Sequence, residues 1–358
     1  MGMIYQIYGG DAHQMTKSLM EAADVIGQIP SGAAVALKPN LVVADAPEQG
    51  ATTHSGVLSG CIEYLQDHGV RDISVMESSW VGARTEDAVR ASGCDKVCQR
   101  YHVPFYDLKK DETRLVNTHV RPMEICRRPL EAGFLIDLPV LKGHCQTRMT
   151  CALKNLKGCI PDREKRRFHT EGLMRPIAAL AAVLRPQLVI VDGICGDLDF
   201  EEGGNPVYSN RMYLGGDPVQ VDVYGCRLLG LAPEEVPYLQ LAEQWGAGSM
   251  ALTDADIVSL NQPDSGAEVP TPTGAVARLS KRVKQDSACS ACYASLVRAL
   301  YELDRAGVRI DREIVIGQGW RGKTTQAVGI GSCCSGAAVS VRGCPPAARE
   351  IAEVLRAL

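Results

Sequence analysis

The chain has 358 residues, of which 46% are hydrophobic and 22% charged, and its net charge is −4. This length suits one large domain or two. An aromatic content of 5% and the lack of a basic excess argue against nucleic-acid binding. The sequence has no apolar run of membrane-spanning length and no signal peptide at its N-terminus. We therefore expect a cytoplasmic protein that binds neither nucleic acid nor membrane.

Short apolar segments alternate with segments of helical spacing through the first 250 or so residues. The spacing predicts strands at 1–10, 33–37, 72–76, 103–106, 134–140 and 188–191, and helices at 57–67, 86–91, 173–184, 219–229 and 237–245. This alternation predicts an α/β fold with a mostly parallel sheet and helices on both faces. Polar segments follow the strands at 38–40, 77–79, 142–144 and 192–193. Because ligands bind at the carboxyl ends of parallel strands, we expect one shared cleft there.

A proline-containing segment, 261–273, is typical of a linker. It predicts a domain of residues 1–262, with the ligand cleft, and a smaller α/β domain of residues 263–358. In the second domain the spacing predicts a helix at 293–306, a strand at 313–316, a glycine-rich loop at 317–322 and a final helix at 347–358.

The chain has fourteen cysteines, and five of them lie between residues 289 and 344. In a reducing compartment such a surplus indicates metal or redox chemistry rather than disulfides. Cys289 and Cys292 lie three positions apart at a helix start, where the helix dipole favours thiolates. Cys333 ends a glycine-rich loop, and Cys344 precedes two prolines that stiffen its loop.

Four such thiolates suit a [4Fe–4S] cluster, which we predict is bound by Cys289, Cys292, Cys333 and Cys344. A tetrahedral zinc site is the first alternative, and buried, unligated cysteines are the second. Cys334, the next residue in the sequence, is the alternative to Cys333 as a cluster ligand.

The same motif resembles the proximal-cluster motif of the small subunit of nickel–iron hydrogenases. The order is CxxC, a glycine-rich loop ending in cysteine, and GCPP, within the last quarter of the chain. The resemblance implies a flavodoxin-like cluster domain. Hydrogenase activity is not implied, because the nickel ligands belong to the large subunit.

The densest polar motif, LKGHCQTRMTCALKNLKG, spans residues 141–158. It is accompanied by Lys38-Pro39-Asn40, Thr53-His54, His169, Val191-Asp192-Gly193, Gly216-Asp217-Pro218 and Asp222. Together, over roughly residues 33–250, these motifs resemble the DUF362 family, a domain of unknown function sometimes found in iron–sulfur proteins. The resemblance brings no reaction with it.

Residues of this motif form the candidate catalytic set. Lys142, His144 and Lys154, with Lys157, could bind a carboxylate or phosphate, and His144 could act as acid or base. Alternatively, the lysines are solvated and His144 bonds the backbone. The rest of the set is Asn155, His169 and Asp192.

Several of these polar residues could instead have a purely structural role. The basic segment 161–169 is either an exposed charged loop or a lid that carries His169 into the cleft. Asp192 is either a functional carboxylate or a turn cap. Asp217 is expected to cap the helix that begins at Pro218, and Asp222 faces either the cleft or solvent.

Residues 317–324, GQGWRGKT, fit the letters of a phosphate loop. A phosphate loop must open a helix, however, and Cys333 follows too soon. We therefore expect a loop that shapes the cluster environment, with Trp320 shielding the cluster.

These observations predict a cytoplasmic iron–sulfur redox protein of anaerobic metabolism. It would transfer electrons, as an oxidoreductase, to a small anionic molecule in the N-terminal cleft or to a redox partner protein. The alternatives are a non-redox hydrolase, lyase or ligase with a structural cluster, and a sensor of iron or oxygen.

Overall fold

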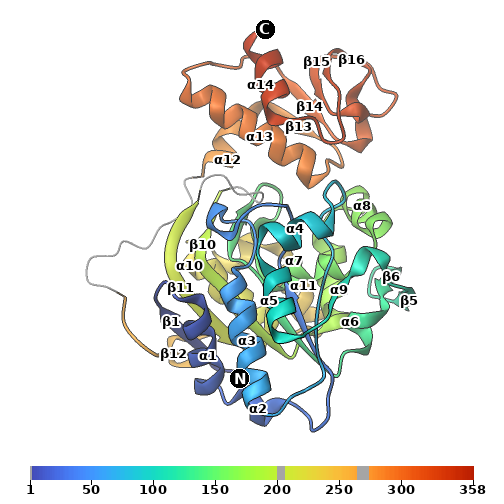
Figure 1. The fold of residues 1–358 in the computed structure, drawn as a ribbon. Helices are drawn as coiled ribbons and strands as arrows, with labels where there is room; N and C mark the ends of the chain where they lie inside the picture. Colours follow the sequence, from blue (N-terminus) through green and yellow to red (C-terminus); the bar gives the residue numbers. More distant parts are fainter. Residues whose placement is uncertain (1, 200–205, 264–273) are drawn as a thin grey trace.

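The structure is a computed structural model that describes residues 2–199, 206–263 and 274–358 (Figure 1). Its larger N-terminal unit, up to residue 263, is built on an eight-stranded sheet, and its C-terminal unit, from residue 274, on a four-stranded sheet. Most of the predicted linker, residues 264–273, lies outside the described residues.

The eight-stranded sheet is mostly parallel. Its strands, in spatial order, are β12 (Ile257–Ser259), β1 (Ile4–Tyr8), β11 (Val207–Gly215), β10 (Leu188–Gly196), β7 (Phe134–Leu138), β2 (Val35–Pro39), β3 (Ile73–Glu77) and β4 (Phe105–Asp107). Only β11 runs antiparallel to its neighbours in this sheet. The central strands β2, β7 and β10 are buried along their whole length, because helices cover both faces.

Helices cover the two faces in chain order. The first face carries α1 (Ala12–Ala22), α2 (Val25–Gln28), α3 (Ser55–Asp67), α4 (Thr85–Ala91) and α5 (Cys94–Tyr101). The second carries α6 (Arg127–Glu131), α7 (Ala152–Asn155), α8 (Asp162–Glu171), α9 (Met174–Leu184), α10 (Pro218–Leu228) and α11 (Pro237–Gln244). Each set packs on its own apolar core, so the unit has three layers (Figure 1).

Two small antiparallel pairs extend this unit: β5 (Thr113–Asn117) with β6 (Pro122–Cys126), and β8 (Lys142–His144) with β9 (Arg148–Thr150). Short 3-10 turns join the main elements: η1 (Pro47–Gln49), η2 (Leu108–Lys110), η3 (Leu156–Cys159), η4 (Pro233–Glu235) and η5 (Asp254–Asp256).

The C-terminal unit is a smaller α/β layer. Its parallel strands are β13 (Val283–Gln285), β14 (Ile314–Ile316), β15 (Thr325–Ile330) and β16 (Ala337–Val341). Its helices and turns are α12 (Ala275–Leu279), η6 (Ser280–Arg282), α13 (Ser290–Arg305), η7 (Gln318–Trp320), η8 (Ser332–Cys334) and α14 (Ala348–Arg356). Helices α13 and α14 share one core with the sheet. The strands lie in chain order, which differs from the 2-1-3-4-5 order of flavodoxin.

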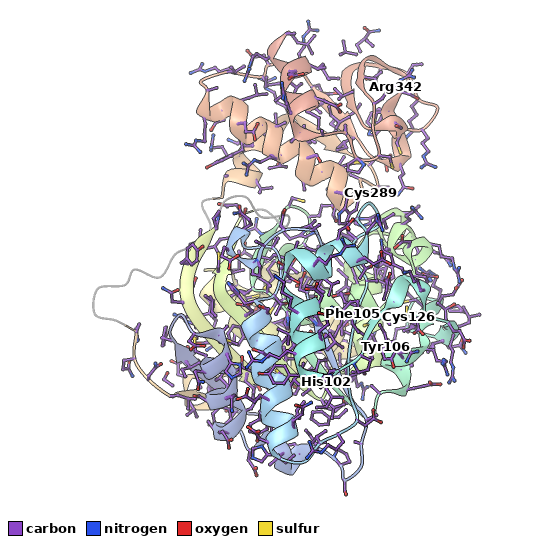
Figure 2. The ribbon with its side chains drawn as sticks, viewed as in Figure 1. His102, Phe105, Tyr106, Cys126, Cys289 and Arg342 are labelled. Carbon is purple, nitrogen blue, oxygen red and sulfur yellow. The ribbon has the colours of Figure 1, made fainter. Side chains whose placement is uncertain are left out.

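The two units meet at the turn between β8 and β9. Gln146 in this turn donates to the backbone oxygen of Ala288 (3.0 Å) and to Gln285 Oε1 (3.1 Å). Its own Oε1 accepts from Ser290 Oγ at 2.9 Å. Figure 2 shows Cys289 at the edge of the C-terminal unit that faces the larger unit. The cysteine loops therefore lie against the N-terminal unit.

The predicted α/β class and mostly parallel sheet are confirmed, but several segments differ from the prediction. Segment 142–144, expected as a loop, is strand β8 of a hairpin. Segment 161–169, also expected as a loop, belongs to helix α8. Strand β11 was not predicted, and neither were helix α1 and strands β5, β6, β12, β13, β15 and β16. Among the described residues, none of the helices combines the length and apolar character that crossing a membrane requires.

Candidate functional site

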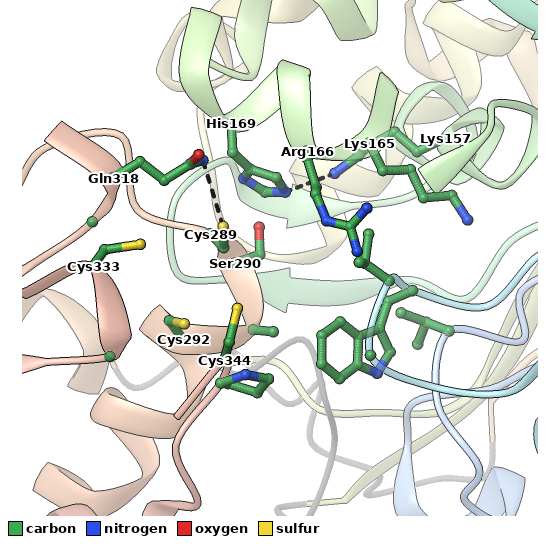
Figure 3. Close-up of a pocket in the computed structure, with 18 of the residues that line it drawn as sticks. Lys157, Lys165, Arg166, His169, Cys289, Ser290, Cys292, Gln318, Cys333 and Cys344 are labelled. Atoms are coloured by element: carbon green, nitrogen blue, oxygen red, sulfur yellow. Dashed lines mark hydrogen bonds between the residues drawn. The ribbon is translucent and has the colours of Figure 1, made fainter. Parts of the chain in front are cut away.

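A cavity of about 260 Å³ lies where the two units meet (Figure 3). The N-terminal unit contributes the carboxyl ends of β2 and β3, the segment from α7 to η3, and one side of α8. The C-terminal unit contributes the start of α13 and three loops. The cavity lies next to the point where the strand order reverses, since β3 follows β2 on one side and β7 lies on the other. Open α/β sheets bind ligands at such a point.

A buried ion pair forms the floor. Lys38 Nζ, at the end of β2, lies 2.7 Å from Glu77 Oε2 at the end of β3, and both residues are almost fully buried. Burial lowers the pKa of Lys38, but Glu77 together with the nearby Cys159 and Asp137 outweighs this effect, so the net shift of the pKa is upward. The pair fits only because residue 158 is a glycine: a Cβ there would lie 1.7 Å from Glu77 Oε1.

Asn155 connects this floor to β7. Its Nδ2 donates to Asp137 Oδ1 at 2.7 Å, and Asp137 is paired with Lys38 in the register of β7 and β2. Complete burial raises the pKa of Asp137 to about 8, against the opposing effect of Lys38. This carboxyl group is therefore mostly protonated at neutral pH.

Helix α8 supplies a cationic wall. Arg166 and His169 point from it toward the cavity, which Lys165 also lines, and Lys157 Nζ lies 3.4 Å from His169 Nε2 (Figure 3). Lys154 also lines the cavity and donates to Thr150 Oγ1 at 3.2 Å.

Lys165 is the most buried cation on α8, at 5% exposure. Its Nζ donates to Ser78 O (3.1 Å), Ser78 Oγ (2.6 Å) and Ser79 O (2.7 Å). These acceptors are neutral, and the carboxylate of Asp162 is 3.8 Å away. Burial lowers the pKa of Lys165 to about 8, partly offset by Glu77.

The opposite wall carries the four predicted cluster ligands. Cys289 is the N-cap of α13, Cys292 lies in its first turn, Cys333 lies in η8 and Cys344 follows β16. All four line the cavity. Burial, with the other cysteines adding to it, raises the pKa of Cys292 to about 12. Four thiols are thus crowded where a bound cation would stabilise their thiolates.

Two side chains donate to these sulfurs: Gln318 Nε2 lies 3.7 Å from Cys289 Sγ, and Arg321 Nε lies 3.4 Å from Cys333 Sγ. Cys334, the rival of Cys333, points the other way. It is 1% exposed, and its Sγ donates to the backbone oxygen of Gly317 at 3.9 Å. The geometry therefore favours Cys333 as the residue that faces a bound group.

Within the described ranges, no group of three or more His, Cys, Asp or Glu side chains could hold a single metal ion. The four cysteines nevertheless line one cavity. A zinc ion needs all four sulfurs about 2.3 Å from one centre, whereas a cube takes one thiolate at each of four iron corners. Four cysteine donors match the ligand set of an iron–sulfur cube, and the same set can also bind zinc.

Three members of the candidate set lie outside the lining of this cavity. Lys142 is fully buried, and its Nζ donates to the backbone oxygen of Ala51 at 2.7 Å. His144 Nδ1 accepts from the backbone N–H groups of Gln146 (2.9 Å) and Thr147 (3.0 Å), which fixes the hairpin turn at the junction. Asp192 Oδ2 accepts from the backbone N–H of His54 and lies 2.8 Å from its Nδ1. Lys154, Asn155 and His169 do line the cavity.

The remaining two aspartates have capping roles. Asp217 accepts from the backbone N–H groups of Val219 and Gln220 and caps α10, as predicted. Asp222 faces neither the cleft nor solvent: it is buried and accepts from the backbone N–H groups of Ala152 (2.7 Å) and Leu153 (3.3 Å) at the start of α7.

Trp320 does not have the expected shielding position. It packs beside Cys334 on the other side of the small sheet, and Trp80 of the N-terminal unit lines the cavity instead. Segment 317–324 leads into strand β15, not a helix, so it lacks the architecture of a phosphate loop.

Sequence reasoning missed Lys165, Arg166, Trp80, Gln318 and Arg321. Lys165 and His169 are four positions apart, which is helical spacing, and that signal was available within the charged segment.

Comparison with known proteins places this geometry in a family. The family model described as domain of unknown function (DUF362) matches residues 35–227, more than half of the chain. The thylakoid-associated protein sll1697 of Synechocystis sp. is 24% identical over 247 residues, which cover 66% of this chain and 75% of the relative.

Two solved structures are similar at lower levels. The lactate racemase apoprotein of Thermoanaerobacterium thermosaccharolyticum is 12% identical, with a TM-score of 0.45, over 63% of this chain and 56% of that one. A Thermotoga maritima protein is also 12% identical, with a TM-score of 0.39, over 66% of this chain and 60% of that one. The match of the family model, over the strands and helices that build the cavity floor and α8, shows that the chain belongs to the DUF362 family.

Proposed function

We propose that this protein is an iron–sulfur redox protein that holds one [4Fe–4S] cluster at the cysteine wall and reduces a small anionic molecule in the adjoining cavity. The observation that carries the proposal is the convergence of Cys289, Cys292, Cys333 and Cys344. They come from three separate segments and line one cavity with the cations of α8.

The position of the cysteines favours direct chemistry on a ligand. A cluster held only on an outer face would serve a partner protein, whereas these sulfurs border the same cavity as Lys165 and His169. The cluster would supply electrons one at a time, and the cations would hold the anion beside it. Cys344 is exposed, which leaves a side from which a redox partner protein could deliver electrons.

The state of the cysteines is consistent with a reducing compartment such as the cytoplasm. All fourteen are free thiols. Disulfides form and persist mainly in oxidising compartments, so cysteine-rich chains without them are typical of reducing ones. An oxygen-sensitive cluster suits anaerobic metabolism in such a compartment.

The test is anaerobic purification followed by measurement of iron, sulfide and zinc and by electron paramagnetic resonance after reduction. We expect about four irons and four sulfides per chain. Cys333→Ser and Cys334→Ser form a matched pair of neighbours: the first is expected to lose the cluster and the second to retain it. About one zinc per chain without sulfide, or full iron in Cys333→Ser, would contradict the proposal.

A further inference from the structure

The cavity has an apolar side that an inorganic anion would not use. Trp80, Val81 and Val42 line it next to the cationic wall. The backbone N–H of Trp80 donates to Val42 O at 3.0 Å, and Lys109 Nζ donates to Trp80 O at 2.9 Å, so the segment is held in place.

The position of the Trp80 indole ring depends on the glycine at residue 82. A Cβ on Gly82 would lie 1.9 Å from Trp80 Cη2, so the ring lies directly over a glycine that has no side chain to displace it. The result is an aromatic surface at the rim of the cavity. Trp rings bind the faces and edges of other flat rings better than they bind aliphatic groups of the same size.

The charged side chains around the cavity differ in the partners that they already have. Arg321 is occupied with Cys333 Sγ at 3.4 Å, and Glu77 with Lys38 at 2.7 Å. Lys165, in contrast, donates only to neutral oxygens at hydrogen-bond distance. The nearest carboxylate, that of Asp162, is 3.8 Å from Lys165 Nζ, which is beyond hydrogen-bond distance. An anion that enters the cavity would therefore add to the stabilisation of this buried ammonium ion.

We propose that the ligand of this cavity is a small aromatic carboxylate, with its carboxylate bound by the α8 wall at Lys165 and its ring against Trp80. This inference deepens the proposed function and rests on it for the redox step, but not for binding. A cavity of about 260 Å³ is below the size of drug-sized pockets, so the ligand is a single ring rather than a nucleotide.

The experiment measures binding of four probes to the full chain by calorimetry and tryptophan fluorescence: benzoate, cyclohexanecarboxylate, acetate and inorganic phosphate. Benzoate is expected to bind most tightly. Lys165→Met is expected to weaken every carboxylate by about tenfold or more, and Lys165→Arg to restore part of the loss. Trp80→Leu is expected to remove the preference for benzoate over cyclohexanecarboxylate, a change of about tenfold at most, and to leave acetate unchanged.

The controls are Lys96→Met, at an exposed lysine on α5, and Trp245→Leu, at a tryptophan that stacks on His119 outside the cavity. Neither is expected to alter binding. Phosphate bound more tightly than benzoate and insensitive to Trp80→Leu would overturn the inference in favour of an oxyanion site. Absence of carboxylate binding would overturn it as well.

Iron content and thermal unfolding, measured on the same samples, separate the two proposals. Iron-free protein that still binds benzoate through Lys165 and Trp80 would refute the redox function and keep the ligand assignment. Cluster-loaded protein that does not bind benzoate would refute the ligand assignment and keep the redox function.

Discussion

At the scale of single residues, several buried ionisable groups lie together at the cavity floor. Their interactions fix which of these groups are charged and which are neutral. Lys38 is paired with Glu77, and Asp137 lies opposite Lys38 in the next strand. Asp137 Oδ1 accepts from Asn155, whereas in the described part of the chain Oδ2 has no hydrogen-bond partner. A neutral carboxyl group suits this environment better than a second carboxylate beside Glu77.

This arrangement predicts that Asp137 makes the protein less stable as the pH rises. Its pKa is near 4 in the unfolded chain and about 8 in the folded protein. Between these values the folded state binds more protons than the unfolded state, so the free energy of unfolding falls with increasing pH. The fall is at most about 1.4 kcal/mol per pH unit for one group.

Asp137→Asn mimics the protonated side chain and keeps the acceptor for Asn155, so we expect its stability to vary less between pH 5.5 and 7.5 (approximately the interval between the two pKa values). Urea unfolding at several pH values measures the slope. Asp45→Asn, at an exposed position, is the control and should keep the slope of the parent. Equal slopes in Asp137→Asn and the parent would show that this carboxyl does not carry the effect.

At the scale of elements, η3 must pass close to the ends of β2 and β3. The backbone oxygen of Gly158 accepts from Ser78 Oγ at 2.6 Å, which fixes η3 over the floor. A methyl group at this position would lie 2.9 Å from Lys38 Nζ and still closer to Glu77. Either η3 moves away or the buried ion pair separates.

Gly158→Ala is therefore expected to destabilise the protein by about 3 kcal/mol, as overpacking at a buried charge pair does. Gly10→Ala is the matched control, because a Cβ at Gly10 meets nothing within 4 Å. Thermal unfolding of the two variants gives the comparison. A Gly158→Ala variant as stable as Gly10→Ala would mean that the floor can rearrange freely.

The same elements show how much could be predicted from sequence. The cysteine wall was predictable because each ligand candidate lies in a short local motif, so spacing alone brings Cys289 and Cys292 to one helix start. The cleft residues were predictable only in part: Lys154, Asn155 and His169 line the cavity, whereas the other three candidates do not. After β7 the chain runs beside β10, where Val140 forms a parallel β-bridge with Asp192. Lys142 therefore lies next to β10, away from β2 and the cavity.

Helix α8 was missed for a different reason. Of its ten residues only Phe168 is a large apolar residue, so the segment has no hydrophobic periodicity. It is helical because Arg, Lys and Glu are good helix formers and because Asp162 and Glu164 lie in its first turn. Its tertiary role as a cationic wall depends on Lys165 reaching Ser78, which no local pattern encodes.

At the scale of the whole molecule, the cavity exists only while the two units stay together. Gln146 joins them with three hydrogen bonds, and the turn that presents it is fixed by His144. The turn that contains His144 and Gln146 thus contributes to the site from a distance, by holding the N-terminal unit against the loops that carry Cys289. This gives His144 a positioning role at the junction.

Gln146→Ala removes these bonds and is expected to loosen the junction without unfolding either sheet. A neutral hydrogen bond contributes about 1 kcal/mol. The loss of free energy is therefore large relative to the contact between the two units but small relative to the stability of each unit's core. We expect faster amide hydrogen exchange at 288–292 and weaker anion binding, while the amides of β2, β7 and β10 exchange as before. Gln244→Ala, at an exposed position on α11, should change none of these rates. If Gln146→Ala left exchange and binding unaltered, packing alone would hold the units together, and the hairpin turn would have no part in forming the site.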